Sequence, residues 1–284
     1  GMEAIIDKCV QPAAENRYQS CADLLYDLEH PELITRGFKR MQKRRLAAFT
    51  VSAILCLVLL AAGFGCRMMA KRINNNNYDT LVSAVNSIDS YKQAVEIYPE
   101  RTEAYTKILE AYETEGVFSK KQNDEFLALY NAHKDEFDET SADVAELNYK
   151  IGMMYFNYYT NENGSSDFSN RVQKAYPFFA ANYENERIST QFGERSLSDC
   201  YYQICSFYKK YILNSASVEE ASRSNYDELF TVIERALDDV KDAGAYDQLS
   251  LYNGVFMLLY DQRASMASVN VDQDQIQELL RRVY

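Results

Sequence analysis

One uninterrupted apolar stretch limits what this chain can fold into more than any other feature. Residues 46–66 read LAAFTVSAILCLVLLAAGFGC and contain no charged residue, no asparagine, no glutamine and no proline. As a helix rising about 1.5 Å per residue, the stretch is about 30 Å long, which matches the hydrocarbon thickness of a bilayer. A buried helix of a soluble protein is seldom apolar on every side over such a length. The stretch therefore predicts a single membrane-spanning helix.

The charges on either side of this stretch predict its orientation. Residues 31–45 hold six basic side chains and one acid, whereas residues 67–77 hold three basic side chains before the chain turns acidic. Basic residues stay on the cytoplasmic side when a helix inserts. We therefore expect a single-pass protein of the cell membrane with a cytoplasmic N-terminus and an extracytoplasmic C-terminal domain. The basic linker at 31–45 should also attract anionic membrane lipid.

The charge and the few helix breakers of the remaining chain predict its class. Residues 1–72 carry a net charge of +4 and residues 73–284 a net charge of −16, which makes the larger part a poor partner for nucleic acid. After residue 73 the sequence has only two prolines, Pro99 and Pro177, and six glycines. So few breakers over such a length indicate an all-α domain.

No residue pattern predicts catalysis or a metal site. His30 and His133 are isolated, and the cysteines lack metal-ligand spacing. Cys200 and Cys205 lie five apart on one expected helix and point in different directions, so we expect two buried thiols rather than a disulfide. The acidic run at 135–139 lacks the glycine of a calcium loop and is interpreted as a solvated face. Catalytic residues, cofactors and metals are predicted to be absent from this chain.

The first 30 residues read as two short helices with a polar loop between them. Residues 2–10 are apolar at helical spacing, Pro12 lies in the polar break, and Ser20 can cap a second helix at 21–29. A piece of this size does not fold independently.

These residues resemble the C-terminal end of bacterial serine/threonine protein kinases. The resemblance rests on IIDKC at 5–9, PAAENRYQS at 12–20 and ADLLYDL at 22–28. In that family a helix ending near KC leads through a loop of the form P…xxR(Y/F)xS into the last C-lobe helix. The resemblance implies a structural role for Arg17, as the arginine that pairs with the glutamate closing the activation segment.

The rest of the kinase pattern is missing from this sequence. It has no Gly-rich loop, strand lysine, catalytic-loop Asp/Asn pair or metal-binding Asp-Phe-Gly. The resemblance therefore implies that ATP and Mg²⁺ belong only to a kinase core upstream, and residues 1–30 are expected to be the remnant of its C-lobe.

Residues 78–284, after a linker at 67–77, show helical periodicity that repeats. Tyr105, Ile108 and Tyr112 follow a helix ending in Tyr-Pro, a pattern that resembles the tetratricopeptide repeat, although Leu109 occupies the position where that family has a small residue. A second copy has the aliphatic, small and aromatic positions of a first helix and three matching positions of a second helix. These six residues are Ile151, Gly152, Tyr155, Ala175, Phe179 and Asn182.

Two further helix pairs complete the expected domain. They are 197–213 with 226–240, and 246–262 with 273–284, separated by breaks at 161–166, 214–217 and 242–244. Pro177 predicts a kink or a later helix start. The first helices recur about every 40 to 50 residues, more than the 34 of the family, so the repeats are degenerate. We expect a tetratricopeptide-like α-solenoid, with a less regular helical bundle as the alternative.

Tyrosines are concentrated in this domain, which holds 21 of the 23. A stacked solenoid leaves a concave surface, and tyrosine suits it because the ring packs while the hydroxyl stays wet. The alternative is that most of these rings form the helix–helix core. The candidate groove aromatics are Tyr105, Tyr112, Tyr155, Tyr159 and Tyr202.

Two functional hypotheses follow. In the first, the chain is the membrane-anchored sensor segment of a bacterial serine/threonine kinase, and its exported repeats bind a protein, peptide or cell-wall ligand and relay to the cytoplasm, with homodimerisation as one route. In the second, it is a membrane-anchored tetratricopeptide scaffold without signalling catalysis.

Overall fold

The computed structural model describes residues 1–185, 195–213 and 220–284, except the side chains of 34–39 and of Glu184. The described residues are helical almost throughout, which confirms the all-α class. The expected break at 214–217 lies outside the described residues. The chain divides into two compact units, Gly1–Ile73 and Asn74–Tyr284.

The first unit contains the two short helices expected from the sequence. The side chain of Ser20 accepts a hydrogen bond from the backbone N–H of Asp23 at 3.1 Å, so Ser20 is the N-cap of the second helix. The elements are α1 (Met2–Cys9), the 3₁₀ turn η1 (Ala14–Asn16), α2 (Cys21–Glu29) and α3 (Pro31–Val82), which continues into the second unit.

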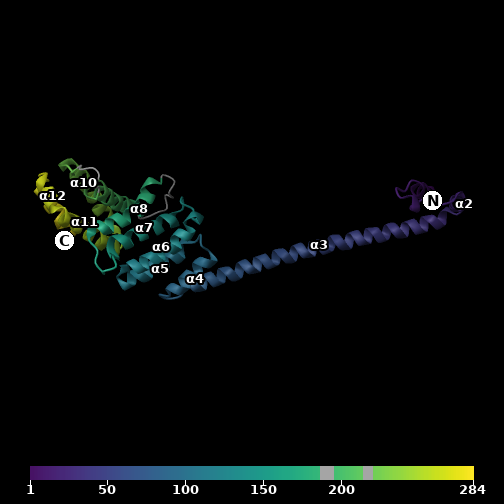
Figure 1. The fold of residues 1–284 in the computed structure, drawn as a ribbon, viewed down its shortest axis with the longest axis horizontal. Coiled ribbons are helices and arrows are strands. Elements are labelled where there is room, and N and C mark those ends of the chain that lie inside the picture. The colour runs from purple at the N-terminus through teal and green to yellow at the C-terminus, as the bar shows by residue number, and fades with distance from the viewer. Residues whose placement is uncertain (186–194, 214–219) are drawn as a thin grey trace. The chain divides into compact units, whose positions relative to one another are not determined.

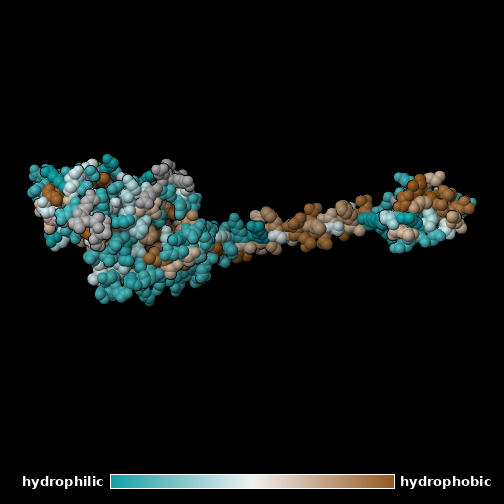
Figure 2. Space-filling model, turned by 45° about the horizontal axis from the view of Figure 1, so that its top comes forward, coloured by the Kyte–Doolittle hydropathy of each residue, from teal (hydrophilic) through white to brown (hydrophobic). Residues whose placement is uncertain are grey.

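The apolar stretch lies within α3, and every one of its residues from 46 to 66 is exposed to solvent. By length and composition, the segment Arg40–Val82 could cross a membrane, and none of its most apolar window is buried. Figure 2 shows the hydrophobic side chains along this helix in brown.

Residues 67–77, expected to be a linker between the apolar stretch and the repeats, are helical and belong to α3. Residues 67–82 contain neither proline nor glycine, so nothing in this segment breaks the helix. Thr80 donates its hydroxyl to the carbonyl of Asn76 at 2.7 Å. Tyr78 and Val82, at the end of α3, are buried in the second unit.

The second unit is built from short helices joined by brief connections (Figure 1). The helices of ten residues or more are α4 (Ile88–Ile97), α5 (Thr102–Glu115), α6 (Lys120–His133), α7 (Ala142–Tyr158), α8 (Phe168–Glu184), α9 (Arg195–Phe207), α10 (Arg223–Asp239), α11 (Ala245–Asp261) and α13 (Gln273–Val283). Shorter elements are η2 (Lys134–Glu136), the π-helical turn η3 (Tyr208–Ile212), η4 (Val240–Asp242) and α12 (Arg263–Ser268).

Most helices pack against their neighbours in sequence, as the expected pairs require. Contacts join α4 to α5, α7 to α8, α8 to α9, α9 to α10, and α11 to α13. Two contacts depart from this order, because α5 packs on α7, past α6, and α11 also packs on α7. The hydroxyl of Tyr149 in α7 donates to Asp247 Oδ1 in α11 at 3.3 Å, and a Cβ on Gly254 in α11 would lie 2.8 Å from Phe156 Cε1 in α7.

Two details differ from the sequence-based expectations. The helix α8 begins at Phe168, after the N-cap Asp167, and contains Pro177, so a later helix start at this proline is wrong. Two strands of two residues, β1 (Phe118–Ser119) and β2 (Tyr159–Thr160), pair in parallel, and no sequence pattern predicted them.

Candidate ligand-binding cavity

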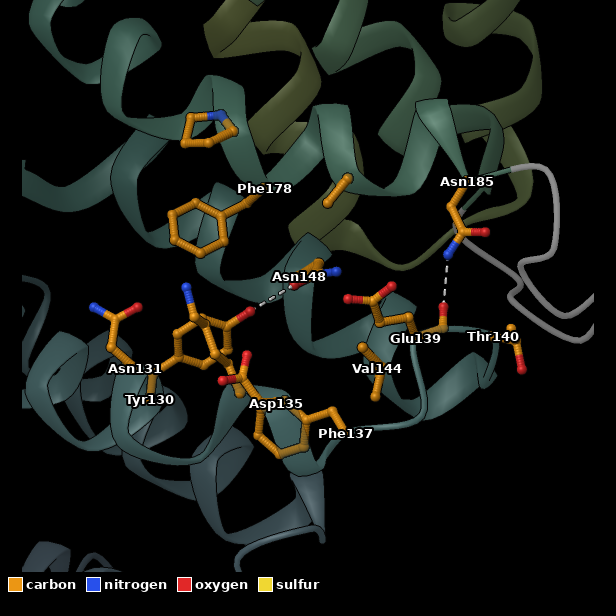
Figure 3. A pocket seen from close by; sticks show the side chains of 13 residues that line it. Tyr130, Asn131, Asp135, Phe137, Glu139, Thr140, Val144, Asn148, Phe178 and Asn185 are labelled. Atoms are coloured by element: carbon orange, nitrogen blue, oxygen red, sulfur yellow. Dashed lines mark hydrogen bonds between the residues drawn. The ribbon is translucent and has the colours of Figure 1, made fainter.

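A cavity of about 850 Å³ lies in the second unit between the end of α6, the loop that follows it, and α8 (Figure 3). Its volume is within the range of small-molecule and peptide sites. It is lined by Tyr130, Asn131, Lys134, Asp135, Phe137, Glu139, Thr140, Val144, Asn148, Pro177, Phe178, Ala181 and Asn185.

One wall is the connection from α6 to α7, which local hydrogen bonds hold in shape. The carboxylate of Asp138 accepts hydrogen bonds from the backbone N–H of Thr140 at 3.0 Å and from its hydroxyl at 2.7 Å. The two hydrogen bonds lower the pKa of the Asp138 carboxylate, and the bond from the Thr140 hydroxyl has the larger effect. Ser141 then caps α7 by accepting from the N–H of Val144 at 3.2 Å.

Asn185 joins this wall to the end of α8. Its Nδ2 donates to the backbone carbonyl of Glu139 at 2.7 Å, as the dashed line in Figure 3 shows. The loop and α8 are 46 residues apart in sequence at this contact. The hydrogen bond therefore fixes the distance across one side of the cavity.

Two residues of the lining, Tyr130 and Asn148, belong to a series of hydrogen-bonded polar side chains that continues into the core. The hydroxyl of Tyr130 donates to Asn148 Oδ1 at 3.4 Å, and Asn148 Nδ2 donates to Asn182 Oδ1 at 3.3 Å. Asn182 Nδ2 in turn donates to the carbonyl of Ala145 at 2.9 Å and to the hydroxyl of Ser198 at 3.3 Å. Buried amides that are paired in this way fix the relative positions of α7, α8 and α9.

Aromatic rings line the interior of the cavity. Tyr130 and Phe178 are half-buried, and their ring centroids lie 6.1 Å apart in an edge-on arrangement. Tyr130 also packs against Phe137, whose ring centroid is 5.8 Å away. Burial raises the pKa of the Tyr130 hydroxyl, so it remains a hydrogen-bond donor at neutral pH.

The rim carries Lys134, Asp135 and Glu139, all exposed, which gives it a net charge of −1. Aromatic faces, side-chain amides and a weakly acidic rim suit a neutral or cationic ligand that can both stack and form hydrogen bonds. The lining residues include no histidine, cysteine or serine, and they form no nucleophile–base pair.

Four of the five tyrosines singled out from the sequence are buried in the core. The exposed fractions of Tyr105, Tyr112, Tyr155 and Tyr159 are 0%, 2%, 2% and 4%. Tyr105 donates its hydroxyl to the carbonyl of Pro99 at 3.1 Å, while Tyr155 donates to Asn123. These rings pack between helices because they lie on the faces that neighbouring helices cover.

Tyr202 is half-buried and belongs to an aromatic cluster away from the cavity. Its ring stacks on that of Tyr183 with centroids 4.0 Å apart, and Tyr176 lies 5.9 Å away. The ammonium of Lys209 lies 3.9 Å from the centroid of Tyr176. The structure therefore does not bring Tyr202 together with the cavity aromatics.

Arg17, in the first unit, holds the loop between α1 and α2. Its Nε donates to the carbonyl of Gln11 at 2.6 Å, and its Nη2 donates to that of Pro12 at 3.2 Å. The residue is exposed and has a structural role in this loop.

The cavity residues were missed because α6 was not expected. The sequence did contain one signal, since Ser119 and Gln122 form a capping box at the start of α6.

Comparison of the chain with models of protein families, with curated proteins and with solved structures found no match.

Proposed function

We propose that this chain anchors an extracytoplasmic helical binding domain in the cell membrane as the sensor segment of a serine/threonine kinase. The observation that carries the proposal is the fully exposed apolar stretch at 46–66 of α3, flanked by basic residues at 40–45. Exposing so many apolar side chains to water is unfavourable, and a bilayer removes that cost. The excess of basic residues on the N-terminal side supports a cytoplasmic N-terminus.

The domain that follows is proposed to be a modified tetratricopeptide-like solenoid. The pairs α4–α5, α7–α8 and α9–α10 supply the repeated helical hairpins, and α11 folds back onto α7. The cavity beside Tyr130 and Phe178 is the proposed ligand site, and peptides or cell-wall fragments are the proposed ligand class.

Topology can be tested with thiol labelling in intact cells. A chain with Cys9, Cys21, Cys56 and Cys66 changed to serine is given one new cysteine, by Ser224→Cys in the second unit or by Glu29→Cys in the first. A membrane-impermeant maleimide should label the Ser224→Cys variant in intact cells and the Glu29→Cys variant only after lysis. The reverse labelling would contradict the proposed orientation, and labelling of both or of neither in intact cells would contradict the division across a membrane.

Ligand binding can be tested with the full chain in nanodiscs. A mixture of soluble muropeptides with amidated carboxyl groups, which carry no net negative charge, is the probe, and the retained species are measured by mass spectrometry. We expect the double variant Asn148→Leu/Phe178→Ala to lose retention, and Ser224→Ala to keep it. If both variants retain the same species, the cavity is not the site.

Signalling can be tested by deleting residues 74–284 in a protein that joins this chain to a kinase core. Loss of stimulus-dependent phosphorylation is expected. Unchanged phosphorylation would favour the scaffold instead.

A further inference from the structure

The helix α11 has a second face that no other part of the described chain covers. Leu249, Phe256 and Tyr260 have exposed fractions of 67%, 48% and 58%, and Asn253 between them is also exposed. The opposite face of the same helix is core, formed by Leu251, Val255, Leu258 and Leu259. Large apolar side chains gathered on one exposed helix face indicate an interaction surface.

The spacing on this face is that of a coiled-coil seam. Tyr246 precedes Leu249 by three residues and is 40% exposed. Arg263 follows Tyr260 by three residues, and its guanidinium carbon lies 4.3 Å from the centroid of the Tyr260 ring. Five positions of α11, 246, 249, 253, 256 and 260, alternate in steps of three and four, as a and d positions do, and Arg263, the first residue of α12, follows at the next step. We call these six residues the α11 seam.

The α11 seam is complementary to itself when two copies run antiparallel. A two-fold axis between residues 254 and 255 places Tyr246 opposite Arg263 of a second copy, and Leu249 opposite Tyr260. At the centre, the short side chain of Asn253 faces the ring of Phe256. Each layer then pairs an a position with a d position, and each large side chain has a smaller or flexible one opposite.

Charge selects the antiparallel arrangement over the parallel one. The N-terminal end of the seam is acidic, since Asp242 lies near it and the hydroxyl of Tyr246 donates a hydrogen bond to the carboxylate of Glu113. The C-terminal end carries Arg263, whereas the carboxylate of Asp261 beside it accepts hydrogen bonds from Tyr208 and Gln262. Antiparallel packing brings Arg263 to the acidic end twice, whereas parallel packing would place the two Arg263 side chains together.

We propose that the α11 seam is a homodimer interface, in which α11 of one chain packs antiparallel against α11 of a second copy. The interface is closed by a two-fold axis, the commonest symmetry of homo-oligomers. One helix seam buries less than the approximately 800 Å² per partner of a standard interface, so the dimer is weak between free molecules. This step rests on the proposed membrane anchor: two chains anchored in the same membrane meet at a high effective concentration, which strengthens such a contact.

The test is disulfide cross-linking of the full chain in liposomes, with the four exposed cysteines changed to serine and the buried Cys200 and Cys205 kept. A Leu249→Cys chain with one epitope tag is mixed with a Tyr260→Cys chain with another tag and oxidised. The mixed-tag product should exceed either same-tag product several-fold. The Ser224→Cys variant on α10, also exposed, gives the background from random collision.

Each outcome decides the proposal. A mixed-tag product that disappears when Phe256→Arg is added to both chains, with the helical circular dichroism unchanged, supports the antiparallel seam. Dominant same-tag products would overturn the antiparallel arrangement. A mixed-tag yield no higher than the yield from the Ser224→Cys chains would overturn the interface altogether. Neither result depends on whether the cavity binds a ligand.

Discussion

The ring of Phe179 in α8 lies directly against the backbone of Gly152 in α7. A Cβ placed on Gly152 would lie 2.6 Å from Phe179 Cε1, closer than packed atoms allow. Phe179 is fully buried, so its ring has no free space into which to move. This contact sets how closely α7 and α8 approach.

We expect Gly152→Ala to destabilise the second unit. Overpacking a core costs about 1–3 kcal/mol, and the better helix propensity of alanine returns at most about 1 kcal/mol. Denaturant unfolding followed by circular dichroism measures the difference. Gly244→Ala, in the same unit, is the control, since the one atom within 4 Å of a Cβ there is Asp247 Oδ2, at the ordinary contact distance of 3.9 Å. Equal midpoints for the two variants would contradict the contact.

A second prediction concerns the polar chain beneath the cavity. Asn182→Ala removes a partner of the Asn148 amide and of the Ser198 hydroxyl, both of which would remain buried. Leaving such groups unpaired costs about 1–3 kcal/mol each, so a clear loss of unfolding free energy is expected. Asn131→Ala, an exposed amide at the same cavity, should change stability by less than about 0.5 kcal/mol. Similar losses for both would show that the polar chain contributes nothing.

The close contact of Gly152 with Phe179 shows which features of this chain sequence patterns predict well. Its place as the small residue of a first helix, with Phe179 on the second, was implied by the resemblance to the tetratricopeptide repeat, and the burial of Cys200 and Cys205 was expected from their places on one helix. The helix α6 was missed because polar residues interrupt its apolar stripe. The cavity could not be predicted, since it depends on a loop meeting α8 some 46 residues later. Periodicity also cannot say which face a neighbouring helix will cover, so the burial of Tyr105 came only from the structure.

The pH dependence of stability should include a contribution from Glu110. Burial acts to raise its pKa, but hydrogen bonds from Lys107 at 2.7 Å and Lys150 at 3.2 Å outweigh it and lower the pKa below 4.5. A carboxylate with a lowered folded-state pKa stabilises the protein above its unfolded pKa and loses that effect as pH falls through the folded value.

The stability of the second unit should therefore decline on acidification from about pH 5, and Glu110→Gln should reduce that decline. The effect is below about 1 kcal/mol because the side chain is partly exposed. Unfolding free energies at pH 7 and pH 3.5 measure it for both proteins. Glu146→Gln, whose carboxylate lies farther from Lys150 at 3.6 Å, is the control. The same pH dependence in wild type and Glu110→Gln would count against the ion pairs.

Thiol reactivity should separate the cysteines into two groups. Burial raises the pKa of Cys200 to about 12 and also raises that of Cys205, so both should resist alkylation at pH 8 in the folded protein. Cys9 and Cys21 are exposed and should react rapidly. Mass spectrometry after iodoacetamide, with and without denaturant, counts the modified sites. Rapid modification of Cys205 without denaturant would show that α9 is not packed as described.

The final prediction concerns the apolar stretch of α3. Leu57 and Leu60 are 66% and 71% exposed in this helix, near its centre. An arginine at the centre of a membrane helix costs about 3 kcal/mol for insertion. The double variant Leu57→Arg/Leu60→Arg should therefore move from the carbonate-resistant membrane fraction to the soluble or aggregated fraction. Leu57→Ile/Leu60→Ile keeps the apolar character and should stay in the membrane. Continued membrane retention of the arginine variant would mean that another part of the chain holds it there, because a lone helix carrying two central charges lacks the apolar surface that drives insertion.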